Sequence, residues 1–111
     1  MSNTAYAGYD AISLRPDGTS GESLIDRRLA AAAIGDATAC FDMGVAHSTG
    51  SHGVEWDLVE AHKWFNLAAL AGLEEAATCR AEIAEDMTAR EIAEAQRRAR
   101  EWLKATTRKA A

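Results

Sequence analysis

Apolar residues from Leu24 onward recur at intervals of three and four, the spacing of one face of an α-helix. Five segments share this pattern, and glycines or capping residues separate them. No comparable run alternates apolar and polar residues as a half-buried strand does. The pattern therefore predicts an all-α protein with helices over residues 20–35, 36–48, 57–71, 73–85 and 88–104.

Capping residues mark where the helices begin. Asp36 precedes the second helix as its predicted N-cap, because its carboxylate can accept hydrogen bonds from free backbone N–H groups. Asp57 with Glu60, and Thr88 with Glu91, have the spacing of capping boxes.

The chain also repeats itself. A shift of 37 residues superposes Gly35 on Gly72 and Ala39 on Ala76, and it brings Ala31–Ala32 onto Ala68–Ala69. Each match falls at a helix end, a glycine corner or a new helix start. Such a period is typical of stacked helical units that share one continuous core.

These residues resemble Sel1-like repeats, an α-helical repeat family related to tetratricopeptide repeats. The resemblance implies a short α-solenoid of about five helices in stacked antiparallel pairs. It assigns structural roles to the residues that match the family pattern: Gly35, Ala39, Gly44, Gly53, Asp57, Ala61, Trp64, Ala68, Gly72 and Trp102.

The chain departs from the repeat pattern near its first helix. Arg27 and Arg28 stand where the second repeat has Trp64 and Phe65. A terminal unit has a neighbour on one side only, so the loss of large core side chains is expected there. Trp102 restores a tryptophan in the last helix, which should therefore pack against the array.

We expect the repeat domain to cover residues 21–105, with an N-terminal tail over 1–20 and a C-terminal tail over 106–111. The turn Arg15-Pro16-Asp17-Gly18 separates the N-terminal tail from the first helix. Tyr6, Tyr9, Ile12 and Leu14 make this tail apolar enough to dock, so it is either flexible or docked. It could cover a groove of its own domain, or the protein could self-associate.

Alanine supplies 25 of the 111 residues, and Leu, Ile, Val and Phe together supply only 18. This composition favours helices that pack closely through small side chains.

Charge and hydrophobicity limit the possible partners and location of the protein. The net charge of −5 argues against nucleic acid as a partner. No apolar run is long enough to span a membrane, and we expect a cytoplasmic protein with reduced thiols.

Candidate chemistry centres on His47, His52 and Cys40, with Asp42 and Asp57 near them in sequence. Their spacing matches no familiar zinc pattern. His47 can instead cap or pack its helix, His52 can be a solvated loop residue, and both Cys40 and Cys79 can be buried, inert thiols. We predict no catalytic residue, no cofactor and no metal.

Candidate binding residues lie in the third helix. The resemblance to helical-pair repeats implies that the first helix of each pair lines the concave side of the stack, and we expect residues 57–71 to form such a helix. Ala61, Trp64 and Ala68 should then face the core, whereas His62 and Asn66 should share a neighbouring face. That face either binds a partner or is ordinary solvated surface.

The last helix carries many charges. Glu94 with Arg98, and Arg97 with Glu101, have the spacing of intrahelical ion pairs on a solvated face. The alternative is a basic contact for an acidic protein surface, formed by Arg97, Arg100, Lys104, Arg108 and Lys109.

The function predicted from the sequence is a non-catalytic protein–protein interaction module, regulatory or scaffolding, that binds a peptide or protein surface and can form a homo-oligomer. The alternative is a small metal-binding or catalytic protein that uses His47, His52 and Cys40.

Overall fold

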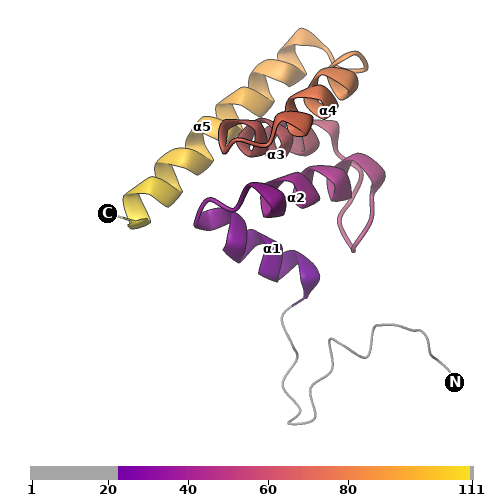
Figure 1. Ribbon diagram of the computed structural model, residues 1–111. Coiled ribbons are helices and arrows are strands. Elements are labelled where there is room, and N and C mark those ends of the chain that lie inside the picture. Colours follow the sequence, from indigo (N-terminus) through magenta and orange to yellow (C-terminus); the bar gives the residue numbers. More distant parts are fainter. Residues whose placement is uncertain (1–22, 111) are drawn as a thin grey trace, which may run out of the picture.

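The computed structural model describes residues 23–110, with side chains as far as Thr107. The predicted tail over residues 1–20 lies outside the described residues. Within these residues five helices follow one another (Figure 1): α1 Leu24–Ala33, α2 Ala37–Thr49, α3 Leu58–Leu70, α4 Glu74–Ala84 and α5 Ala89–Ala110. The predicted all-α repeat fold is confirmed.

Two helix ends differ from the prediction. The first helix begins at Leu24, because Ser23 is its N-cap and forms a reciprocal capping box with Asp26. The last helix reaches Ala110 and does not end at Lys104. Thr106, which was expected in the C-terminal tail, lies within this helix, and its hydroxyl donates to the carbonyl oxygen of Trp102.

The other predicted caps form with one change. Asp36 accepts from the N–H of Ala39, and Thr88 forms its predicted box with Glu91. Asp57 accepts from the N–H groups of Val59 and Glu60. The side chain of Glu60, however, forms ion pairs with Lys63 and Arg98 and does not complete the box.

The two glycine corners explain the 37-residue period. Gly35 follows α1 with φ of 91°, and Gly72 follows α3 with φ of 107°. Residues with a Cβ atom rarely adopt these values, so glycine is needed where the chain turns into the next helix. The same turn is thus built twice, at equivalent positions of successive units.

Helix α3 lies at the centre of the stack. It packs against α2, α4 and α5, whereas α1 packs mainly against α2 (Figure 1). Ala61 and Ala68 of α3 and Ala99 of α5 are buried, which allows the helix backbones to approach closely. The predicted core face of α3 is confirmed.

Two tryptophans fill the space between α3 and α5. Trp64 is buried, and its ring meets Trp102 edge to face with ring centroids 4.8 Å apart. This geometry is favourable because the positive edge of one ring faces the negative face of the other. Trp102 therefore packs α5 against the array, as predicted.

Ion pairs continue the same contact at the surface. Arg98 donates to Glu60 of α3 at 2.7 Å and to Glu94 of α5 at 2.8 Å. Burial alone would raise the pKa of Glu60, but its hydrogen bonds with Lys63 and Arg98 lower it overall. The ammonium of Lys63 lies 4.2 Å from the ring centroid of Trp64, so the charged network borders the aromatic pair.

Replacing Trp64 with alanine should lower the free energy of unfolding by about 3–5 kcal/mol, because it leaves a cavity between α3 and α5. Trp56→Ala is the matched control, since Trp56 is 63% exposed and its loss should change stability by less than about 0.5 kcal/mol. Urea unfolding followed by circular dichroism measures both. Similar unfolding midpoints for the two variants would contradict a core role for Trp64.

Gly44→Ala should destabilise the protein by about 1–3 kcal/mol, although alanine normally favours a helix over glycine. A Cβ atom at this position would lie 2.5 Å from Cδ1 of Phe65, whose ring is buried and packs against Phe41. Thr38→Ala, at an exposed position of the same helix, is the control. A higher melting temperature for Gly44→Ala would show that the Phe65 ring can move aside.

Candidate partner-binding groove

An apolar groove of about 610 Å³ opens where the ends of four helices meet. It lies between the corner that joins α1 to α2, the last turn of α3 and the C-terminal part of α5, and is hereafter the helix-end groove. Its large side chains are Ile34, Leu67, Leu70, Trp102 and Leu103, with Cys40 from α2.

Small residues explain why this space is open. Ala32 and Ala33 end α1, Gly35 forms the corner, and Ala71 follows α3. None of them has a side chain long enough to fill the gap between α1 and α5. The alanine-rich sequence that permits close helix packing elsewhere therefore leaves a hollow where two helices diverge.

The groove exposes apolar side chains to solvent. Ile34 is 87%, Leu70 is 65% and Leu103 is 41% exposed. Grouped exposed apolar residues of this kind mark interaction surfaces more often than scattered ones do. None of the three was singled out by sequence reasoning, because their proximity depends on how α1, α3 and α5 are arranged.

The thiol of Cys40 lines the groove and is not activated. Burial, and secondarily the charge of Asp36, raises its pKa to about 11. Nucleophilic cysteines need a lowered pKa, so this thiol stays protonated at neutral pH. Its surroundings favour apolar contact rather than nucleophilic chemistry.

The second cysteine is not activated either. Cys79 of α4 is half-buried, and burial together with the charges of Glu82 and Glu75 raises its pKa. Neither thiol is in a disulfide. Cys79 therefore offers no better nucleophile than Cys40.

His47, His52 and Cys40 do not form one site. Nδ1 of His47 lies 3.3 Å from the backbone oxygen of Glu55, which ties the end of α2 to the following loop. His52 is exposed in that loop, whereas Cys40 is buried in the core. Among residues 23–107, no group of three or more histidine, cysteine or acidic side chains is placed to hold a metal ion.

The expected surface position of His62 is wrong. Its side chain is only 3% exposed, and Asn66 accepts a hydrogen bond from Arg80 of α4. The two residues thus lie on the side of α3 that packs against α4, not on an open face. A contact of His62 and Asn66 with a partner stays a prediction. It would require α3 and α4 to separate at these residues.

The charges of α5 are used mainly within the protein. Arg97 and Arg98 both pair with Glu94 at 2.8 Å, so Arg97 pairs with Glu94 rather than with Glu101. These bonds lower the pKa of Glu94 to about 2. Arg100 and Lys104 are exposed, while the side chains of Arg108 and Lys109 lie outside the described residues.

One segment of the chain is similar to a known repeat family. The Sel1 repeat family matches residues 37–73, which begin with α2 and end just after α3. Helix α3 is therefore the second helix of the matched repeat, and its assignment as a first helix was wrong. No curated protein and no solved structure matches the chain. Within the described residues, no helix combines the length and apolar character needed to cross a bilayer.

Acidification should destabilise the fold through His62. Burial, with the nearby charge of Arg80, lowers the pKa of His62 below its usual 6.5. Below about pH 6.5, His62 therefore binds a proton more readily in the unfolded chain than in the folded chain, and the free energy of unfolding falls as the pH falls.

Urea unfolding between pH 5 and pH 7.5 should therefore show a smaller pH dependence in His62→Gln than in the wild-type chain. His52→Asn, which removes an exposed loop histidine, is the control. Equal slopes for the wild-type chain and His62→Gln would mean that His62 does not cause the loss.

Proposed function

Since the Sel1 repeat at residues 37–73 makes this chain a Sel1-like repeat protein, we propose that it is a non-catalytic interaction module that binds an apolar peptide segment in the helix-end groove. Sel1 repeats generally mediate protein–protein interaction. The observation that carries the proposal is the grouping of Ile34, Leu70 and Leu103, three exposed apolar side chains, on one hollow.

The size of the groove favours a short segment over a large flat partner. A volume of about 610 Å³ is in the range of sites that enclose a small ligand, and it can receive a few side chains. A stable dimer of globular proteins usually needs about 800 Å² from each partner, which requires far more surface than this hollow.

The lining of the groove favours apolar ligands. The residues that line it are all uncharged. Apolar contacts within the groove would therefore supply the affinity. A regulatory or scaffolding role, in the cytoplasm, is the setting we propose for such a module.

Leu103→Asp should weaken peptide binding by about tenfold or more, because it places a carboxylate against an apolar ligand. Random peptides displayed on phage are selected on the wild-type chain, and their Kd values are then measured by fluorescence anisotropy. Val45→Asp is the matched control, since Val45 is 37% exposed but lies on α2 outside the groove.

Circular dichroism first verifies that both variants fold. The proposal requires that the selected peptides lose affinity for Leu103→Asp and keep it for Val45→Asp. Peptides that bind all three chains equally would place the binding surface elsewhere and overturn the groove assignment.

A further inference from the structure

We propose that residues 6–14 of this same chain occupy the helix-end groove, so that the protein covers its own binding site. This inference rests on the proposed function, because it names a competitor for the same groove. Residues 1–22 lie outside the described residues, and the reach and apolar content of this segment favour the contact.

The point of attachment puts the groove within reach. The described chain begins at Ser23, the N-cap of α1, and the groove lies at the other end of this helix. A helix of 10 residues is about 15 Å long. The chain between Leu14 and Ser23 spans up to about 30 Å when extended, so residues 6–14 can reach the groove without strain.

The segment has the side chains that the groove needs. Tyr6, Tyr9, Ile12 and Leu14 place four large apolar groups within nine residues. Ile34, Leu70 and Leu103 keep apolar surface exposed at the groove. Each large side chain that moves from water into this hollow stabilises the contact, because its apolar surface is removed from water.

Covalent attachment decides between this occupant and a second copy of the chain. A short tether holds the segment near the groove at an effective concentration in the millimolar range. A second molecule at micromolar concentration cannot compete unless its own contacts are much stronger. The groove is also too small for the interface that a stable dimer needs.

Engineered thiols in the full chain test the proposal. Ser13→Cys marks the segment between Ile12 and Leu14, and Thr107→Cys marks the exposed groove side of α5. Arg90→Cys, exposed near the start of the same helix, is the matched control for Thr107→Cys. All chains also carry Cys79→Ser, while the buried Cys40 is kept.

The measured quantity is the yield of intramolecular disulfide in glutathione buffers at low protein concentration. The proposal requires an effective concentration about tenfold higher for the pair of Ser13→Cys with Thr107→Cys than for the pair with Arg90→Cys. Adding Tyr9→Ser and Ile12→Ser should abolish this preference, because the apolar contacts are then lost.

Equal effective concentrations for the two pairs would overturn the proposal. Disulfide-linked dimers whose yield rises with protein concentration would also overturn it and would identify a second copy as the occupant. A preference that survives Tyr9→Ser and Ile12→Ser would show that the tether alone causes it, which likewise contradicts a specific contact.

The peptide measurements keep this result separate from the proposed function. If selected peptides bind the groove and no disulfide preference appears, the interaction module stands and the self-covering segment is rejected. If the preference appears but no peptide binds, even with Tyr9→Ser and Ile12→Ser in the chain, the self-covering segment stands and the groove has no external peptide partner.

Discussion

The edge-to-face contact between Trp64 and Trp102 determines how the rest of the molecule is arranged. Helix α5 is highly charged, and the alanines that it buries offer little apolar surface of their own. The two indole rings, 4.8 Å apart, provide the large apolar contact that fixes α5 to α3. Once α5 is held there, its C-terminal half forms one wall of the helix-end groove.

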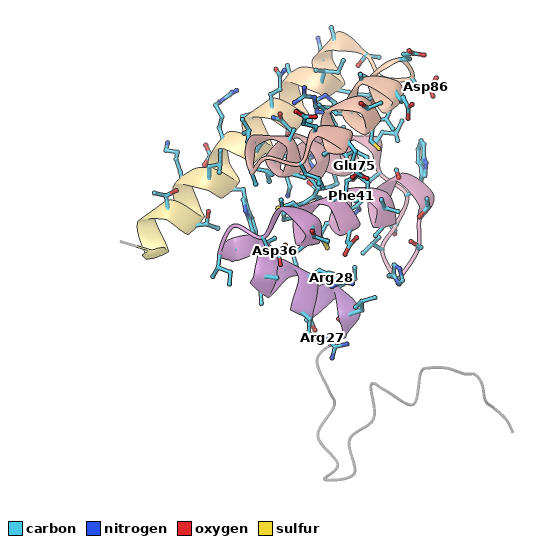
Figure 2. The ribbon with its side chains drawn as sticks, in the orientation of Figure 1. Arg27, Arg28, Asp36, Phe41, Glu75 and Asp86 are labelled. Carbon is cyan, nitrogen blue, oxygen red and sulfur yellow. The ribbon has the colours of Figure 1, made fainter. Side chains whose placement is uncertain are left out.

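The opposite wall of the groove is formed by Ala32, Ala33, Ile34 and Gly35, and α1 has no aromatic contact equivalent to that of Trp64. Arg27 and Arg28, which Figure 2 labels on α1, stand in the sequence where the next repeat has Trp64 and Phe65. Arg28 pairs with Asp42 of α2 at 3.0 Å, a partly exposed ion pair that adds little stability. Helix α1 consequently packs mainly against α2, and it contributes no aromatic side chain to a contact with α3.

Sequence reasoning succeeded where the determinants are local. Helical spacing, caps such as Asp36, and the corners at Gly35 and Gly72 depend on residues within one or two turns, so periodicity reveals them. The groove combines residues from helices far apart in sequence and has no local signature. The burial of His62 was missed because a polar side chain four residues from Asn66 resembles a solvated face until α4 is placed beside it.

The same alanine-rich composition therefore has two consequences. Where helices cross, as at Ala61 and Ala99, the absence of a long side chain lets two backbones come close. The helix surfaces at these positions are therefore buried in the core. Where helices diverge, as beyond Ala32 and Ala33, it leaves apolar neighbours such as Leu70 exposed. A chain with a larger residue at those positions would close the hollow, so the binding surface follows from the way in which this small protein builds its core.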